Sequence, residues 1–340
     1  MEASMIGLDI AKRVFHVVGE DSAGNVVLSK RLAREKVEAF FAAHAPATVG
    51  IEACGSSHHW ARRLTALGHD VRLIPAAYVR PFVKRNKTDA RDAAAICEAM
   101  QRPGMRFVPI KSCEQQAARG LESTRNLLVR QRTQLANAVR GLLAEYGIIA
   151  AQGRRGFESL VGRIEQGDAA IPTVLRQALD NLVEQWRSAG RAAEALEAQI
   201  VARARTDATA RRLMTIPGVG PLGAHAIVAA IGDGAQFGSA RDFAAWVGLT
   251  PREHQSANTR RVGHISRQGD QGLRRLLVLG ASAAMRQDRA KPARATLWVR
   301  GILARRPMKV AVVARAAKNA RIAWAMLRSG QPYRATVIAA

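Results

Sequence analysis

Two aspartates, Asp89 and Asp92, stand three residues apart where a helix is expected to begin. Thr88 is of a residue type that caps helix N-termini, and residues spaced by three share one face of a helix. Neighbouring carboxylates repel each other, and a bound cation relieves that repulsion. Acids in a first helical turn are also favoured by the helix dipole alone. The pair is therefore compatible with a metal site and with an ordinary helix start.

Two further acids accompany short apolar runs that we predict to be buried strands. Asp9 lies in the run 4–10, and Glu52 closes the run 48–52. Ligands gather at the carboxyl ends of strands in α/β sheets, so these acids can meet the helical pair. The converging set consists of Asp9, Glu52, Asp89 and Asp92. Four carboxylates suit Mg²⁺ or Mn²⁺ and phosphoryl-transfer chemistry. The alternative is that all four are helix caps and loop acids.

A serine near arginines is the second candidate for chemistry. Ser256 lies in the polar stretch 252–261, which we interpret as a loop, with Arg252, Arg260 and Arg261 close by. Such a serine can attack phosphorus while the arginines stabilise the charge of the transition state. Loop serines more often make only hydrogen bonds, so the residues alone favour that simpler role.

A glycine-rich turn and a basic helix are candidates for nucleic-acid binding. The turn 216–220 (IPGVG) resembles a helix-hairpin-helix motif, in which Gly218 and Gly220 let backbone N–H groups approach phosphate. The alternative is a plain turn between helices. Arg274 and Arg275 lie in the basic helix expected after it, and the helical, Arg-rich stretch that follows is a further binding face or a solvated surface.

The elements that position these residues differ along the chain. Three strands in succession and then alternating helices and strands favour a mixed sheet with helices on its faces. The expected strands are 4–10, 14–18, 26–28, 48–52 and 71–74, and the expected helices between them are 34–43 and 57–67. Residues 115–146 and 174–204 have helical spacing of apolar residues. They form either an ordinary bundle or a coil that pairs subunits.

Composition indicates a polyanionic partner. The net charge is +25, and residues 211–340 contain 22 Lys and Arg against 5 Asp and Glu, whereas 151–210 contain 8 of each. Nucleic acid is the leading partner. The chain has no apolar run of membrane-spanning length and no signal peptide, and its three cysteines lack metal-ligand spacing. We therefore expect a cytoplasmic protein without a membrane partner.

The motifs together resemble the IS-one-ten (IS110) family of insertion-sequence transposases, which includes the pilin-gene invertases. The resemblance runs in order along almost the whole chain. The segments that carry it are 7–12 (GLDIAK), 52–55 (EACG), 86–93 (NKTDARDA), 216–220 (IPGVG) and 248–252 (GLTPR).

The resemblance implies an α/β plus α architecture. A RuvC-like, ribonuclease-H-type domain with a trailing helix is expected at 1–150, a helical coiled-coil dimerisation segment at 151–207, and a mainly helical, basic transposase domain at 208–340. It implies an Asp-Glu-Asp-Asp site for Mg²⁺ or Mn²⁺ at Asp9, Glu52, Asp89 and Asp92, and a nucleophile at Ser256. The family's usual serine loop reads Ser-Ser-Gly-Gly, whereas this one reads Gln255-Ser256-Ala257-Asn258.

The family also implies partners. These are target and donor DNA, a structured noncoding guide RNA called bridge RNA, and a homodimer that assembles into a tetramer on DNA at the bacterial nucleoid. Three hypotheses follow. The chain is an RNA-guided recombinase, which we prefer, a metal-dependent DNA junction or strand nuclease without a covalent intermediate, or a non-catalytic nucleic-acid-binding protein.

Overall fold

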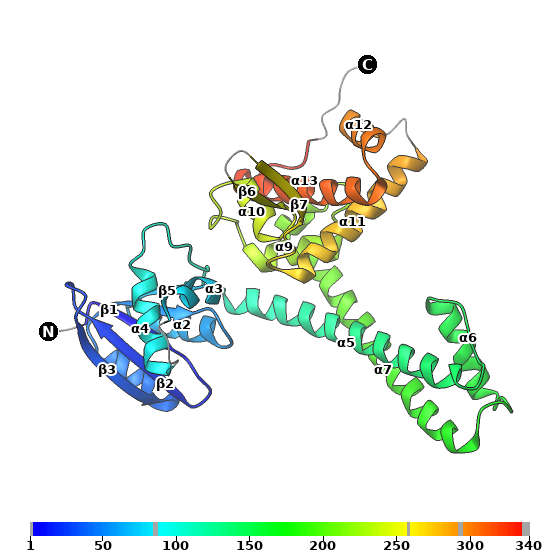
Figure 1. Cartoon of the computed structure of the whole chain (residues 1–340), viewed down its shortest axis with the longest axis horizontal. Helices are drawn as coiled ribbons and strands as arrows, with labels where there is room; N and C mark the ends of the chain where they lie inside the picture. The colour runs from blue at the N-terminus through cyan, green and yellow to red at the C-terminus, as the bar shows by residue number, and fades with distance from the viewer. Residues whose placement is uncertain (1–2, 84–87, 257–258, 292–294, 335–340) are drawn as a thin grey trace. The chain divides into compact units, whose positions relative to one another are not determined.

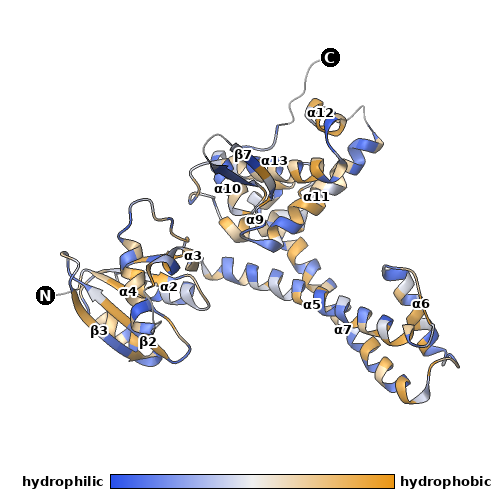
Figure 2. Cartoon of the chain, viewed as in Figure 1, coloured by the Kyte–Doolittle hydropathy of each residue, from blue (hydrophilic) through white to orange (hydrophobic). Residues whose placement is uncertain are grey.

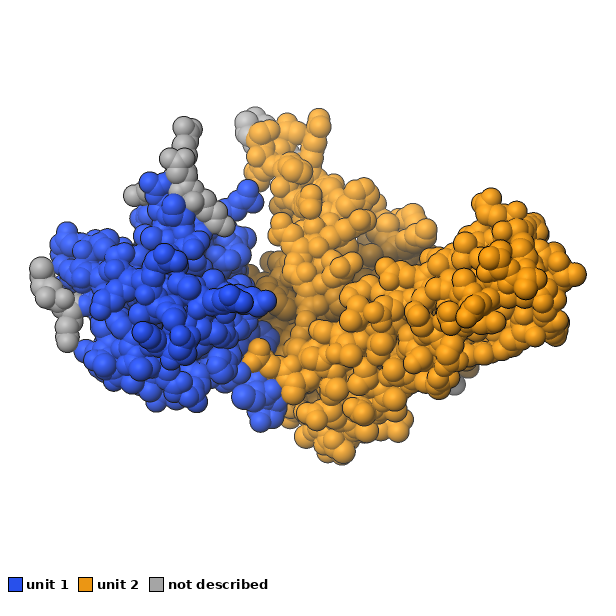
Figure 3. Space-filling model, turned by 90° about the horizontal axis from the view of Figure 1, so that it is seen from below, with its two compact units in different colours: residues 1–114 blue, residues 115–340 orange. Residues whose placement is uncertain are grey.

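The computed structural model describes residues 3–83, 88–256, 259–291 and 295–334, apart from the side chain of Arg260. The chain forms two compact units, Met1–Glu114 and Gln115–Ala340 (Figure 3). The first is a mixed α/β unit and the second is mainly helical, so the predicted fold class is confirmed. The predicted domain boundaries after residues 150 and 207 remain predictions.

The first unit is built on a five-stranded sheet of order β3-β2-β1-β4-β5 (Figure 1). Its strands are β1 Met5–Asp9, β2 Val14–Glu20, β3 Val26–Ala33, β4 Thr48–Glu52 and β5 Asp70–Ile74. β1 pairs antiparallel with β2 and parallel with β4, and β4 pairs parallel with β5. The predicted mixed sheet is therefore confirmed. Strands β1 and β4, which end in the predicted site acids Asp9 and Glu52, are neighbours in it.

Alternation along the central strands assigns their two faces to different helices. Ile6 and Leu8 of β1 belong to one core with Phe41 of helix α1 (Val37–Ala42) and with Trp60 and Leu64 of helix α2 (Ser57–Ala66). Gly7, which lies between the two apolar residues, points to the opposite face. That face is covered by helix α4 (Asp89–Met100), while the short helix α3 (Ala76–Val79) packs beside α4.

Helix α4 approaches the sheet closely because two glycines face it. Gly7 and Gly50 are in register on β1 and β4. A Cβ atom at Gly7 would lie 2.0 Å from the carbonyl oxygen of Ala93, and one at Gly50 would lie 2.4 Å from Sδ of Met100. A larger residue at Gly7 would meet the backbone of α4 and push the helix away from the sheet, whereas one at Gly50 would meet the side chains of Met100 and Ile96. Because the two glycines lack side chains, α4 lies close to the sheet, and its first turn stands beside the end of β1.

The second unit contains long helices and a basic helical region. Its helices are α5 Cys113–Ala144, α6 Arg154–Glu165, α7 Thr173–Thr206, α8 Ala208–Leu213, α9 Pro221–Ile231, α10 Ala240–Trp246, α11 Gln271–Ala290, α12 Leu297–Arg305 and α13 Met308–Ser329. Both long predicted helices are present as α5 and α7, on which hydrophilic and hydrophobic residues alternate (Figure 2). One core joins α5, α6 and α7, and a larger core joins the elements that follow.

The stretch 252–261, interpreted above as a loop, is a β-hairpin, and that interpretation is wrong. β6 spans Pro251–Ser256 and β7 spans Thr259–Ile265, and they pair antiparallel. Every residue of β6 is exposed, so no apolar alternation marks it as a strand. Its backbone hydrogen bonds to β7 hold it in place instead.

In the described part of the chain, no helix is both long and apolar enough to cross a membrane.

Candidate active site

The first acid of the candidate site is fixed by strand pairing. Asp9 is the last residue of β1, and Leu8 pairs with Ile51, so Asp9 and Glu52 end neighbouring parallel strands at the same edge of the sheet. On its other side, Asp9 pairs with His16 of β2. The sheet therefore presents two acids and a histidine at one edge.

Helix α4 supplies two more acids. The hydroxyl of Thr88 accepts a hydrogen bond from the N–H group of Arg91 at 3.4 Å, so the predicted cap is confirmed. Asp89 and Asp92 follow in the first turn. One carboxylate oxygen from each of Asp9, Asp89 and Asp92 lies within 4.8 Å of the other two. Acids that are 80 residues apart in the sequence thus form a single three-acid cluster.

Glu52 stands beside this cluster rather than within it. It is not among the acids whose oxygens lie within 4.8 Å of one another, but its charge acts on Asp9. Its role as a fourth metal ligand remains a prediction.

The cluster is electrostatically unfavourable without a cation. The pKa of Asp9 is raised from 3.8 to about 6, first by burial and then by repulsion from Asp92, Asp89 and Glu52, while His16 opposes the rise. A divalent ion would relieve this repulsion, and the donors are all carboxylate oxygens, which suit Mg²⁺ or Mn²⁺. The residues present therefore fit such an ion, although they do not select between the two metals.

The raised pKa predicts how stability and metal binding depend on pH. In protein freed of divalent ions, Asp9→Asn should raise the melting temperature at pH 8 and have no effect near pH 4. The folded chain holds the Asp9 proton up to about pH 6 and the unfolded chain only to about 3.8, so the contribution of Asp9 to the stability of the wild-type chain falls as pH rises through this window. Because Asp9 is only half-buried, solvent screening limits the shift to a few degrees.

The stabilisation that Mg²⁺ gives should increase as pH rises, because metal and proton compete for Asp9. The stabilisation of the wild-type chain by Mg²⁺ should be larger at pH 8 than at pH 5, as measured by thermal unfolding with and without the ion. Equal stabilisation of wild type and Asp9→Asn by Mg²⁺ would show that Asp9 is not a ligand.

His16 is a site residue that the sequence analysis missed. Its Nε2 atom lies 3.2 Å from an Oδ2 of Asp89, and its side chain is 13% exposed against 64% for Asp89. A nearly buried imidazole thus holds a largely exposed carboxylate. The signal that could have found it is hairpin register, since Asp9 and His16 are directly paired across β1 and β2 with six residues, 10–15, between them.

Ser256 ends strand β6 and is exposed. It pairs with Thr259, and Gln255 pairs with Arg260. Arg252 donates a hydrogen bond to the carbonyl oxygen of Ser266 at 3.0 Å, which ties the base of the hairpin. Residues 257–258 and the side chain of Arg260 lie outside the described part. Ser256 belongs to the second unit, whereas the acids belong to the first.

The IPGVG turn packs closely against α11. Gly218 has a φ of +95°, and a Cβ atom there would lie 2.8 Å from the carbonyl oxygen of Gly280. Asn319 of α13 donates a hydrogen bond to the carbonyl oxygen of Pro217 at 3.0 Å. Gly220 precedes α9, and a Cβ atom there would meet nothing within 4 Å. Gly218 therefore has a packing role, and phosphate binding by the turn remains a prediction.

The two arginines predicted to bind nucleic acid already make contacts within the second unit. Arg274 donates hydrogen bonds to the carbonyl oxygens of Val247 and Gln268, at 2.9 and 2.6 Å. Arg275 donates one to Oδ1 of Asn126 at 2.7 Å. These bonds join α11 to the preceding segment and to α5, and contact with nucleic acid remains a prediction for both arginines.

Two family models match the chain. The model described as "Transposase IS116/IS110/IS902 family" matches residues 210–296, and a DEDD-type model named for IS110 and described as "Transposase" matches residues 6–148. The second match covers all four acids, and the first covers the serine hairpin.

Curated relatives agree with these models. The chain is 46% identical to a "Probable family 20 transposase" of Pseudomonas aeruginosa over 98% of its length and 99% of that protein. It is 37% identical to the "Transposase for insertion sequence element IS1111A" of Coxiella burnetii over 98% and 92% of the two chains. A "Pilin gene-inverting protein" of Moraxella bovis is 40% identical over 20% of this chain and 22% of its own.

Proposed function

This chain belongs to the IS116/IS110/IS902 family of transposases, and from that premise we propose that it cuts and exchanges DNA strands under RNA guidance, with Ser256 as its nucleophile. It is an insertion-sequence transposase, and DNA is its substrate. The observation that carries the proposed chemistry is the convergence of Asp9, Asp89 and Asp92 within 4.8 Å. Because its DNA lies there, the cytoplasm at the bacterial nucleoid is the proposed location.

The proposed step is an exchange of one phosphoester bond for another. The Ser256 oxygen forms a bond to a DNA phosphorus as the bond to one sugar oxygen breaks, and the hydroxyl proton leaves while the departing oxygen gains one. Attack by a hydroxyl of the second strand reverses the step and releases Ser256. The exposed cations of Arg252 and Arg261 lie on the same hairpin and can hold the negative charge.

The acid cluster has a separate task in this proposal. Asp9, Asp89 and Asp92 would hold Mg²⁺ or Mn²⁺, and the bound ion would supply charge stabilisation at the reacting phosphate. His16, whose Nε2 lies 3.2 Å from Oδ2 of Asp89, would orient that carboxylate toward the ion. Glu52, at the end of the neighbouring strand, is the proposed fourth ligand.

One observation favours hydrolytic strand or junction cleavage as the second candidate. The acid cluster lies within a single unit, and Ser256 lies in the other. A metal-activated water at the cluster could cut DNA without a serine adduct. A labelled DNA strand that stays attached to the protein in denaturant supports the recombinase, and free cut ends alone support the nuclease.

Guidance by RNA is tested by identifying the nucleic acid that copurifies with the protein. Nucleic acid should be extracted from the protein purified out of its host and sequenced. A discrete RNA transcribed from DNA flanking the gene is the expected result, and its loops would name the DNA sites to try. A random sample of host RNA would remove guidance from the proposal and leave the DNA chemistry.

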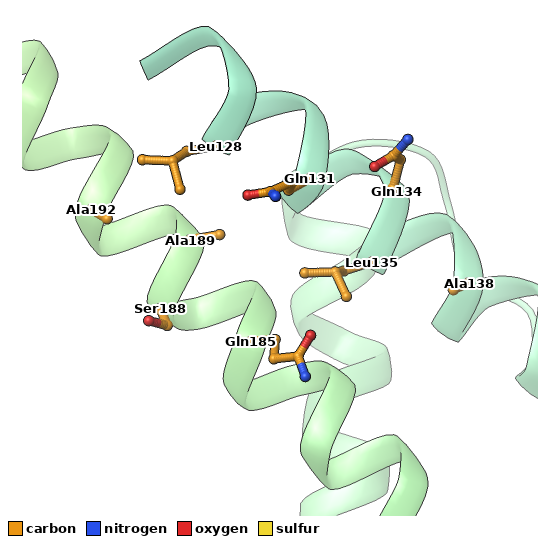
Figure 4. Close-up of a pocket in the computed structure, with 9 residues that line it drawn as sticks. All are labelled: Leu128, Gln131, Gln134, Leu135, Ala138, Gln185, Ser188, Ala189 and Ala192. Carbon is orange, nitrogen blue, oxygen red and sulfur yellow. The ribbon is translucent and has the colours of Figure 1, made fainter. Parts of the chain in front are cut away.

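Self-association is proposed to involve the long helices. A groove of about 480 Å³ between α5 and α7 is lined by alanines, glutamines and two leucines (Figure 4). The lining residues are Leu128, Gln131, Gln134, Leu135, Ala138, Gln185, Ser188, Ala189 and Ala192. None of these side chains is charged, so a helix of a second copy could pack along the groove and form a homodimer from which the tetramer is built.

A charge in this groove should separate the subunits. Ala192→Arg places a cation among the lining residues, and we expect the mass measured by light scattering to fall from dimer to monomer, with dissociation at least about tenfold easier. Ala195→Arg is the matched control, since Ala195 is exposed on the same helix but does not line the groove. If both variants were still dimers by light scattering, the contact between subunits would lie elsewhere.

A further inference from the structure

A hollow in the second unit has no role in the chemistry above. It encloses about 680 Å³ between α12, α13 and the segment that follows α13. We call it the α12–α13 hollow and define it by Trp298, Lys318, Ile322, Met326, Tyr333 and Arg334. The two helices pack on each other (Figure 1). Thr296 caps α12 by accepting a hydrogen bond from the N–H group of Val299.

The walls of the hollow are aromatic and apolar. Trp298 and Tyr333 are both half-buried, so each ring packs partly against the core and leaves a portion exposed. Ile322 and Met326 of α13 add aliphatic surface beside them. A flat, apolar ligand matches such walls, because aromatic side chains bind flat rings by stacking.

The charge of the hollow is positive. Lys318 places its Nζ 4.3 Å from the centroid of the Trp298 ring. Asp288 is the one acid among the described lining residues, and it pairs with the buried Arg315, which leaves the charges of Lys318 and Arg334 to face a ligand. Burial, together with the charges of Arg321 and Arg315, lowers the pKa of Lys318, so an anion there would relieve cation crowding.

We propose that the α12–α13 hollow binds one unpaired nucleotide of a nucleic-acid strand, with its base taking the place of the Lys318 ammonium over Trp298 and its phosphate beside Arg334 and the displaced Lys318. A nucleotide joins a flat ring to an anion, which is the combination that these side chains present. A base paired within a duplex cannot enter, because its faces are covered by its neighbours. The inference rests on the proposed function only for a nucleic-acid partner and needs neither RNA guidance nor the serine.

The test measures binding by the full-length chain to short oligonucleotides that carry 2-aminopurine. Single-stranded RNA, single-stranded DNA and duplex DNA are compared, so the arms show which strand supplies the nucleotide. Wild type should quench the fluorescence of a single strand. Trp298→Ala should weaken single-strand binding about tenfold and abolish the quenching, whereas Trp298→Phe should keep most of both. Duplex affinity should change little.

A charge-matched pair separates the hollow from general basicity. Lys318→Met should lower single-strand affinity and reduce the dependence of log K on log salt concentration by about one. Lys309→Met removes the same charge from an exposed position of α13 outside the hollow, and quenching should persist. If Trp298→Ala proves unfolded by its melting curve, the lysine pair decides the question.

Equal losses for duplex and single strands, or single-strand affinity unchanged in both Lys318→Met and Trp298→Ala, would overturn the proposal. Its outcome is also separable from that of the proposed function. Binding in the hollow can be measured in a chain that makes no serine adduct, and adduct formation can be measured in Trp298→Phe.

Discussion

Ser256→Ala should abolish the covalent link between protein and DNA and lower the rate of strand exchange by at least about a thousandfold. The substitution removes the one atom that the proposal assigns to the attack on phosphorus. It should leave folding intact, because Ser256 is exposed at the end of a strand whose residues are all exposed. The measurement is denaturing electrophoresis of the protein with end-labelled DNA, together with assay of recombined product.

Ser159→Ala is the control for this experiment. Ser159 is an exposed serine of α6 whose hydroxyl donates a hydrogen bond to the carbonyl oxygen of Gly156, so the variant also loses a surface hydroxyl without touching the hairpin. It should recombine DNA at the wild-type rate. Should Ser256→Ala do the same, another group is the nucleophile, and water activated at the acid cluster becomes the leading candidate.

Asp92→Asn should lower metal-dependent DNA cleavage by at least about a hundredfold. Changes to groups that only support metal ligands cost tenfold to a hundredfold, and a ligand should cost no less. The amide keeps the shape of the side chain but removes the carboxylate that, after burial, contributes most to the raised pKa of Asp9. The variant should therefore also lose the gain in melting temperature that Mg²⁺ gives to wild type.

Glu98→Gln tests whether any acid of α4 matters equally. Glu98 lies on the same helix and pairs with Arg102 at 2.8 Å, away from the three-acid cluster. It should keep full cleavage and the full Mg²⁺ shift. A loss in Glu98→Gln as large as that in Asp92→Asn would mean that the helix as a whole, rather than the cluster, responds to lost charge.

The sequence predicted the central sheet well because its strands are short apolar runs between turn signals. Thr48–Glu52 was predicted at its observed bounds. β3 was predicted as 26–28 but extends to Ala33, because it is an edge strand whose polar residues are exposed and carry no apolar alternation. Pairing with β2 sustains it, and pairing is not visible in one strand's composition.

The same reason explains the parts of the site that were missed. His16 depends on register across a hairpin, and β6 depends on its partner strand. Helix α6 lies between the two predicted helices and was not predicted, because glycines stand next to its start at Gly153 and within its first turn at Gly156, and glycine is a poor helix former. Convergence of Asp9 with Asp89 and Asp92 could be predicted from strand ends and a helix cap, but the distance between them is set by packing.

Because of that packing, the site can also be lost through substitution of residues that carry no charge. Gly7 and Gly50 carry no functional group, yet the space that they leave empty fixes how far α4 stands from the sheet. An added methyl group at Gly7 would meet the backbone of α4, and it would move Asp89 and Asp92 away from Asp9 while leaving every acid in the chain. A copy of such an insertion sequence can thus encode an inactive transposase that retains all the acids of the site.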